Sequence, residues 1–206
     1  MDALGYARLA LAAYTSFPTI GREDSASRAI LNWTDDGRVL AIPGTNNTAC
    51  VIADIDCEIV EVNGLGRLHK GFYDASIAIW ESVLLAKPAV LTGHSEGAAI
   101  SLMLAGKLCL AGFPPKAVYA FEPPRTSIDP TLGQLLFAHG VFLFLTRKGK
   151  DIVPVLPPAL LDPWQHPAPL RNIGTALEPF DNEDEHAMSG VVAALDPQPQ
   201  ITQLRD

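Results

Sequence analysis

Residues 88–110 read PAVLTGHSEGAAISLMLAGKLCL, and this stretch decides the fold. Its centre, 93–97, has the pattern Gly-x-Ser-x-Gly of a nucleophile elbow, in which a sharp strand-to-helix turn exposes a reactive serine. Residues 88–91 are a short apolar run between helix breakers, which indicates a buried strand. Residues 98–110 are rich in strong helix formers and contain no proline, which predicts a helix. Strand, elbow and helix therefore follow one another in the order that the motif requires.

The elbow residues suggest a reaction as well as a shape. Gly93 and Gly97 leave room for the turn, because a side chain at either position would collide with neighbouring backbone. Ser95, between His94 and Glu96, is the candidate nucleophile. A serine hydroxyl is a poor nucleophile unless a neighbouring base takes its proton, so a base is expected elsewhere in the chain. The alternative is a glycine-bracketed turn with an incidental serine.

Composition and charge narrow the function classes. The 206 residues fit one domain, 1–206, and 48% of them are hydrophobic, which supports a substantial core and argues against disorder. The net charge of −8 and the lack of a basic cluster argue against nucleic-acid binding. The sequence contains no stretch of eighteen uninterrupted apolar residues, so we expect no membrane span. Interfacial contact with lipid stays open. The N-terminus lacks the basic region of a signal peptide, so we expect a cytoplasmic protein.

Three cysteines, Cys50, Cys57 and Cys109, are few and odd in number, which favours a reducing compartment. A bridge between Cys50 and Cys57 is the alternative to two buried thiols.

Hydrophobic patterns divide the chain into alternating strands and helices. This order predicts an α/β fold with a mostly parallel central sheet, helices on both faces, and reactive loops at the carboxyl ends of the strands. The proline-rich segment 153–169 is either an irregular surface loop or a rigid apolar wall for an acyl chain. The expected helices are 2–14, 70–87, 98–110, 130–139 and 187–195, and the expected strands are 29–34, 39–42, 58–62, 88–91, 116–121 and 141–146.

Three histidines downstream of Ser95 compete to be its base. His186 follows the acidic run 181–185 and is expected on a loop at the start of a helix, where a base can reach over the serine. His166 lies among prolines and is the rival. This fold places the acid between serine and histidine. His139 is therefore a poor candidate, because it precedes a buried strand and the chain before it leaves little room for an acid.

The acid that orients the histidine is assigned to Asp151, in the loop that follows strand 141–146. Two other aspartates compete for this role, but both suit local structure better. Asp129 suits the cap of the helix that begins at Pro130, and Asp162 suits a turn.

An oxyanion hole needs two hydrogen-bond donors. The backbone N–H of Glu96, the residue after the nucleophile, is one. Thr45 can offer a second through its N–H and its hydroxyl, although Gly44 beside it fits a simple turn equally well.

Taken together, these stretches resemble the class 3, fungal-type lipases in order and spacing over most of the chain. The resemblance rests on Ile42-Pro43-Gly44-Thr45, His69-Lys70-Gly71-Phe72, Thr92-Gly93-His94-Ser95-Glu96-Gly97-Ala98, Pro124-Arg125, Asp151-Ile152-Val153-Pro154 with Leu156-Pro157-Pro158, and His186.

The resemblance implies an α/β-hydrolase fold and carboxylic ester hydrolysis, with Ser95, Asp151 and His186 as a catalytic triad. It also implies Thr45 and Glu96 as the oxyanion hole, and a short lid-like segment at 46–56. His69 and His94 would be packing and hydrogen-bonding residues.

Some positions depart from the family pattern. Ile42 and Pro43 replace an aromatic and a basic residue, and Ala98 replaces a glycine. Only about 35 residues separate the acid from the base. A small-ester carboxylesterase therefore stands beside a lipase as the expected activity.

The sequence thus predicts a serine hydrolase that cleaves small-molecule or lipid esters through an acyl-enzyme, without cofactor or metal. A thioesterase or amidase could use the same triad. A catalytically silent α/β-hydrolase domain that binds a partner or a small apolar ligand is the alternative outside catalysis.

Overall fold

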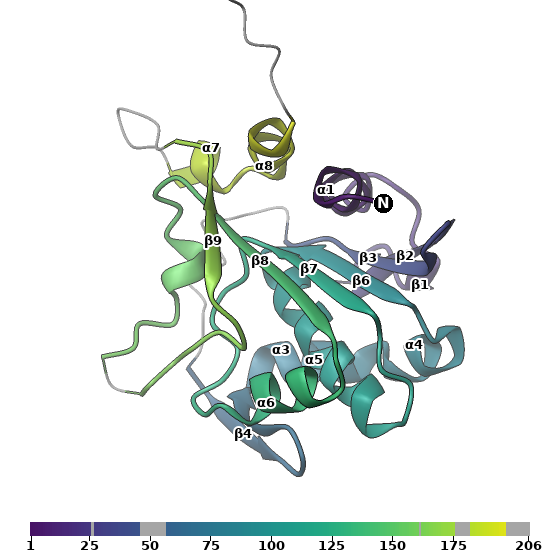
Figure 1. Ribbon diagram of the computed structural model, residues 1–206, viewed down its shortest axis with the longest axis vertical. Coiled ribbons are helices and arrows are strands. Elements are labelled where there is room, and N and C mark those ends of the chain that lie inside the picture. The colour runs from purple at the N-terminus through teal and green to yellow at the C-terminus, as the bar shows by residue number, and fades with distance from the viewer. Residues whose placement is uncertain (26, 46–56, 161, 176–181, 197–206) are drawn as a thin grey trace, which may run out of the picture.

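The computed structural model describes residues 1–25, 27–45, 57–160, 162–175 and 182–196. In this part of the chain, a seven-stranded sheet runs in the order β1-β2-β3-β6-β7-β8-β9 (Figure 1). The strands from β3 to β9 pair in parallel, and the hairpin of β2 and β3 and the short β1 add antiparallel pairs at one edge. The strands are β1 (Ile20–Gly21), β2 (Arg28–Thr34), β3 (Gly37–Ile42), β6 (Val90–His94), β7 (Ala117–Phe121), β8 (Phe142–Lys148) and β9 (Leu170–Ile173).

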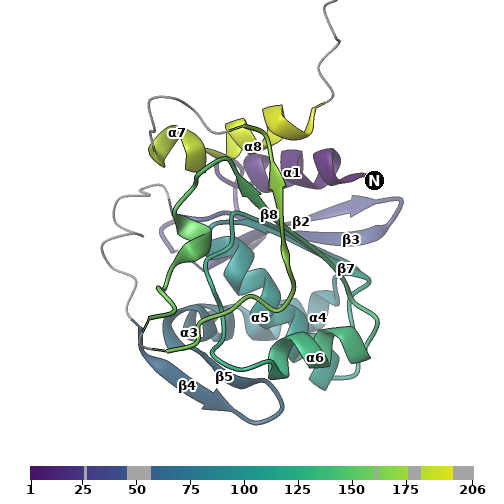
Figure 2. The ribbon, with the colours of Figure 1, turned by 60° about the vertical axis from the view of Figure 1, so that its left-hand side comes forward.

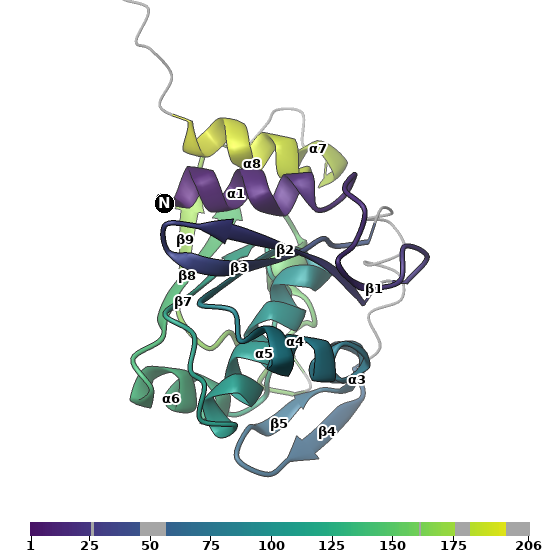
Figure 3. The same cartoon turned by 90° about the vertical axis from the view of Figure 1, so that its right-hand side faces the viewer.

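Helices cover both faces of this sheet. The N-terminal α1 lies beside the C-terminal α8 on one face, and α3 to α6 lie on the other (Figures 2 and 3). The predicted α/β fold with a mostly parallel sheet is therefore confirmed. The helices are α1 (Ala3–Ala12), α3 (Lys70–Ala78), α4 (Trp80–Ala86), α5 (Glu96–Leu110), α6 (Thr131–Ala138), α7 (Asn182–His186) and α8 (Met188–Leu195), with a 3-10 turn η1 (Val153–Val155) and a separate hairpin of β4 (Ile59–Val62) and β5 (Gly66–His69).

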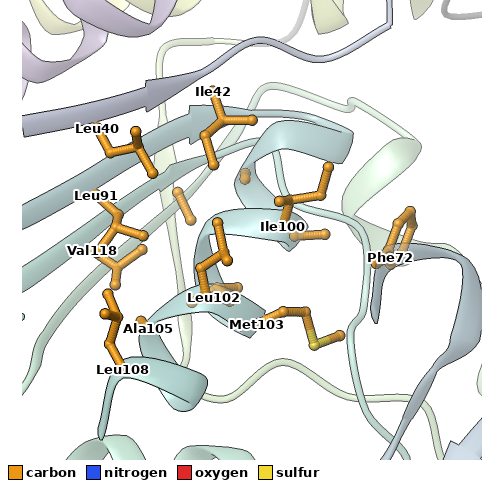
Figure 4. Close-up of a cluster of buried hydrophobic side chains, with 14 of the residues drawn as sticks. Leu40, Ile42, Phe72, Leu91, Ile100, Leu102, Met103, Ala105, Leu108 and Val118 are labelled. Atoms are coloured by element: carbon orange, nitrogen blue, oxygen red, sulfur yellow. The ribbon is translucent and has the colours of Figure 1, made fainter. Parts of the chain in front are cut away.

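Helix α5, which follows the elbow, lies at the centre of the core. Leu91 and Val118 project from neighbouring strands toward Leu102 and Leu108 of α5, and all four side chains are buried (Figure 4). Burying one such side chain contributes about 2 kcal/mol, so α5 is anchored strongly against the sheet. Its nearly uninterrupted apolar sequence follows from this burial on every side.

The predicted hairpin around residues 35–38 is confirmed. Thr34 pairs with Gly37, which has φ 105° and so uses the freedom of glycine at the turn.

Elsewhere the elements differ from the prediction in detail. The single helix expected over 70–87 is two helices, α3 and α4, because the backbone leaves helical geometry at Ile79 (φ −115°, ψ 4°). The side chain of Ile79 is buried in the core, so tertiary packing holds the break. Strand β9 was not predicted, because its sequence Leu-Arg-Asn-Ile is short and half polar.

The remaining expectations concern the cysteines, the lid-like segment 46–56 and membrane spans. Cys57 is exposed, which contradicts a buried thiol there, whereas Cys109, of which no burial was predicted, is buried. Cys50 and the lid-like segment 46–56 lie outside the described residues. None of the helices formed by the described residues is long and apolar enough to cross a membrane.

Candidate active site

Ser95 lies in the sharp turn between the end of β6 and the start of α5. Its backbone has φ 57° and ψ −127°, a conformation that L residues rarely adopt. Such a backbone costs of order 1–3 kcal/mol and persists only where the surroundings enforce it. Here the Ser95 N–H donates to the carbonyl of Phe121 at 2.9 Å. The strain of the elbow therefore falls on the serine itself.

The two elbow glycines are required by close approach of the backbone, as predicted. A Cβ at Gly93 would lie 2.8 Å from the amide nitrogen of Ala98. A Cβ at Gly97 would lie 2.7 Å from the carbonyl carbon of Pro43. Real Cβ atoms do not approach backbone this closely, so no side chain fits at either position.

Asp151 and His186 form a buried pair. The Asp151 Oδ2 and the His186 Nδ1 are 2.6 Å apart, and both side chains are at most 3% exposed. Because a carboxylate can only accept, His186 Nδ1 carries a hydrogen, and in the neutral imidazole the lone pair is therefore on Nε2. The second carboxylate oxygen of Asp151 accepts from the Val153 N–H at 3.0 Å. The acid is therefore fixed by two donors, one of which is the imidazole.

His186, the candidate base, lies at the end of the short helix α7, not on the expected loop at a helix start. Lys148, the last residue of β8, holds this helix. Its ammonium contacts Glu185 Oε2 at 3.3 Å and donates to the carbonyls of Asp184 and Glu185 at 3.1 and 3.2 Å. Glu185 belongs to the acidic run 181–185, and its side chain is fully buried. One member of that run is therefore a buried partner of Lys148.

A series of hydrogen bonds connects the Gly44 loop with His186. The Gly44 N–H donates to the Tyr14 hydroxyl at 3.0 Å, and this hydroxyl lies 2.6 Å from His94 Nδ1. His94 Nε2 is 2.9 Å from the carbonyl of His186. Since a carbonyl only accepts, His94 carries its hydrogen on Nε2, and its Nδ1 accepts from Tyr14.

Burial keeps both side chains in this series of hydrogen bonds neutral. Burial, then the charge of His186, lowers the pKa of His94 well below its ordinary value. Burial raises the pKa of Tyr14 to about 12, so its hydroxyl remains a donor. The role of Tyr14 was missed, because its spacing from Leu4 and Leu11 indicated only an apolar helix face. His94 is a hydrogen-bonding residue, as the resemblance implied.

The Gly44–Thr45 loop lies against the elbow. A Cβ at Gly44 would come within 2.8 Å of Ser95 Cβ. Thr45 Oγ1 and Ser95 Oγ are both buried, and neither has a hydrogen-bond partner in the described part of the chain. Glu96 begins α5, and the first N–H groups of a helix lack intrahelical acceptors and carry partial positive charge. The Glu96 N–H and the Thr45 hydroxyl are therefore the candidate donors, and burial raises the pKa of the Glu96 carboxyl.

The rival residues have other contacts. His166 Nε2 lies 2.8 Å from the carbonyl of Pro154, and burial lowers its pKa to about 4. His139 is exposed at the end of α6. Asp129 accepts from the N–H groups of Thr131 and Arg67 at 2.9 and 2.6 Å, close to its expected capping role.

Part of the proline-rich segment lines a hollow. Residues 165–169 and helix α6 enclose about 670 Å³, and Ser95, Asp151 and His186 are not among the lining residues. Segment 153–169 was expected to be either a surface loop or an apolar wall for an acyl chain. For residues 165–169, the structure does not support an acyl-chain wall at the candidate site.

Comparisons with known proteins identify the family of the chain. The model of the family described as Lipase (class 3) matches residues 39–161, which include Ser95 and Asp151. The chain belongs to the class 3 lipase family. It is accordingly a carboxylic ester hydrolase. No curated protein matches the chain.

Solved lipase structures share the fold. The native lipase–propeptide complex of Rhizomucor miehei is 21% identical with a TM-score of 0.69, over 83% of this chain and 67% of that one. The R. miehei triacylglyceride lipase is 20% identical with a TM-score of 0.66, over 84% and 78%. The Lip2 lipase of Yarrowia lipolytica is 18% identical with a TM-score of 0.65, over 83% and 77%. The chain therefore has the α/β-hydrolase fold of these lipases.

Proposed function

We propose that the protein hydrolyses carboxylic esters through Ser95, His186 and Asp151 and a covalent acyl-enzyme. One observation carries the proposal. The buried Asp151–His186 pair, 2.6 Å apart, holds a hydrogen on His186 Nδ1, so that the neutral imidazole presents its lone pair on Nε2, while Ser95 occupies a strained turn with its hydroxyl unpaired among the described residues. This combination supplies a nucleophile, a base and an orienting acid.

In the first half-reaction, Ser95 Oγ attacks the ester carbonyl while His186 Nε2 takes the hydroxyl proton. The oxyanion accepts hydrogen bonds from the Glu96 N–H and from Thr45, whose buried hydroxyl has no other partner in the described residues. His186 then gives its proton to the departing alkoxide, and the acyl group stays on Ser95.

In the second half-reaction, His186 removes a proton from water, which attacks the acyl-enzyme. Collapse of the second tetrahedral intermediate returns the proton to Ser95 and releases the carboxylic acid. Throughout, the Asp151 carboxylate stabilises the imidazolium and holds its tautomer.

Hydrolysis of p-nitrophenyl esters with acyl chains of increasing length tests the reaction and separates an esterase from a lipase. A preference for short chains favours a small-ester carboxylesterase, and a preference for long chains favours a lipase. Matched thioester and amide substrates test the thioesterase and amidase alternatives.

Variants test the assigned roles. Ser95→Ala should lose almost all turnover, and His186→Ala or Asp151→Asn should lower kcat by about 10³-fold or more. His166→Ala is the matched control and should keep activity near wild type. If His166→Ala abolished turnover and His186→Ala did not, the base would be misassigned.

Labelling by a fluorophosphonate addresses the non-catalytic alternative. Wild-type protein should be labelled on Ser95, and Ser95→Ala should not. A wild-type chain that stays unlabelled would favour a silent binding domain.

A further inference from the structure

A second buried carboxyl lies behind the candidate acid. Glu122 directly follows β7, and Asp151 lies in the loop after β8, so the two residues come from the carboxyl ends of neighbouring parallel strands. Both side chains are 0% exposed. The Glu122 backbone has φ 52°, a left-handed conformation that favours glycine. A glutamate at this position is therefore held by its surroundings against its own backbone preference.

The hydrogen bonds of Glu122 come from neutral groups. Its two carboxyl oxygens accept from the Lys148 backbone N–H at 3.0 and 2.9 Å, and Oε1 accepts from the Thr146 hydroxyl at 3.3 Å. The nearby ammonium of Lys148 is directed instead to Glu185. A fully buried carboxylate with neutral donors alone is costly, which favours the protonated acid.

At the ends of these neighbouring strands, the carboxyl of Glu122 lies within hydrogen-bonding reach of the carboxyl of Asp151. Two carboxyl groups can share a hydrogen bond only if one of them holds a proton. The donors around Asp151 decide which one. Asp151 accepts from the His186 imidazole at 2.6 Å and from the Val153 N–H at 3.0 Å, and both bonds stabilise its ionised form. The proton therefore belongs on Glu122.

We propose that Glu122 is a protonated carboxylic acid that donates a hydrogen bond to the Asp151 carboxylate and so acts as a positioning residue for the acid of the triad. The positioning role rests on the proposed function, whereas the protonation state does not. The neutral acid adds a third donor to Asp151 without adding a second negative charge behind His186.

The charged and titratable groups around Glu122 also favour its protonated form. Burial, followed by the hydrogen bond to Asp151 and its charge, raises the pKa of Glu122 well above its ordinary value. Facing the pair, Lys148 is engaged with Glu185, and Arg147 donates through Nε to the backbone carbonyl of Asp151 at 2.9 Å. His186 lies on the other side of Asp151.

Infrared difference spectroscopy tests the proton without using activity. At neutral pH, wild-type protein should show the C=O stretch of a protonated carboxylic acid, with the band shifting in D2O. Glu122→Gln should lose this band, and Glu61→Gln, which changes an exposed glutamate, should keep it. A wild-type spectrum without the band, or a band that survives in Glu122→Gln, would overturn the inference even if ester hydrolysis is found.

Ester hydrolysis tests the positioning role. A glutamine amide can still donate to Asp151 and accept from Lys148, so Glu122→Gln should keep kcat within about threefold, because one donor replaces another. Glu122→Ala removes the donor to a charged acceptor and should lower kcat by about tenfold or more with KM little changed. An alanine variant with wild-type kcat, or a glutamine variant as impaired as alanine, would refute the role.

The pH profile separates this role from simple space filling. At alkaline pH, ionised Glu122 would place a second negative charge beside Asp151, so wild-type kcat/KM should fall there while that of Glu122→Gln persists. Coincident profiles of the two proteins would contradict the inference. If wild-type protein hydrolyses no ester, the proposed function fails, and the infrared result still decides the protonation of Glu122.

Discussion

The elbow and the acid–base side of the candidate site are built in different ways. The elbow comes from one continuous stretch, 88–110, whose glycines and strained serine make the turn through steric fit. The acid–base side joins β8 and its loop to α7, and buried pairs between residues about 35 positions apart hold it together. The first region is therefore sensitive to added volume, and the second to the loss of a charge or a donor.

The largest effect on stability is expected where the acid–base side loses a buried charge. Lys148→Met would leave the buried Glu185 carboxylate without the ammonium, and breaking a buried pair in this way costs about 3–5 kcal/mol. Helix α7 would also lose its attachment to β8, so kcat should fall. Urea unfolding and ester hydrolysis measure the two effects.

Two variants control this experiment. Lys70→Met breaks exposed ion pairs with Glu58 and Asp74 and should leave the urea midpoint nearly unchanged. The double variant Lys148→Met/Glu185→Leu removes both buried charges and should recover much of the lost stability. If Lys148→Met matched Lys70→Met, the acid–base side would not depend on this pair.

This contrast also determines how far the sequence could predict the structure. Strand, elbow and α5 could be predicted because glycine spacing and apolar pattern are local signals. Asp151 and His186 could be proposed from chain order, and the structure brings them into contact, although their catalytic roles stay predictions. The inward turn of Glu185 and the hydrogen bond of Tyr14 depend on tertiary contacts that no local pattern encodes. The break at Ile79 has the same cause, since core burial overrides helix propensity there.

Added side-chain volume at the elbow should destabilise the protein. Gly97→Ala would drive a methyl group into the backbone of Ile42 and Pro43, which cannot give way as a side chain can. Overpacking of this kind costs about 3 kcal/mol. Thermal unfolding should show the loss, and fluorophosphonate labelling of Ser95 should slow.

Gly71→Ala is the matched control, because it also places alanine in the first turn of a helix. Its Cβ would meet only His69 ring atoms, at 3.4 and 3.6 Å, which is close to ordinary contact. Alanine is the better helix former, so this variant should be as stable as wild type or more so. Equal destabilisation by the two alanines would show that the elbow is not sterically special.

Tyr14 connects the two regions, so its hydroxyl tests whether they are coupled. Tyr14→Phe leaves the Gly44 N–H and His94 Nδ1 without that partner, at a cost of about 2 kcal/mol. Because His94 contacts the carbonyl of His186, we expect kcat to fall with KM nearly constant. Tyr119→Phe is the control, since the Tyr119 hydroxyl makes no hydrogen bond within the described residues. If Tyr14→Phe kept the wild-type kcat, the two regions would act independently.

The smallest effect concerns His166, the histidine that is held neutral by burial instead of being paired with an acid. Its pKa is lowered to about 4 in the folded protein, whereas the unfolded chain binds the proton near pH 6.5. Stability from this group is therefore full above pH 6.5 and is lost progressively as the pH falls toward 4. Between about pH 7.5 and 5.5 the loss is about 1 kcal/mol.

Two glutamine variants isolate this contribution. His166→Gln keeps a donor for the Pro154 carbonyl but cannot be protonated, so its urea midpoint should fall less than that of wild type over the same pH range. His139→Gln, at an exposed position, should follow the wild-type pH dependence. If His166→Gln followed it too, burial would not be holding His166 neutral, and the distinction between His166 and His186 would rest on the Asp151 contact alone.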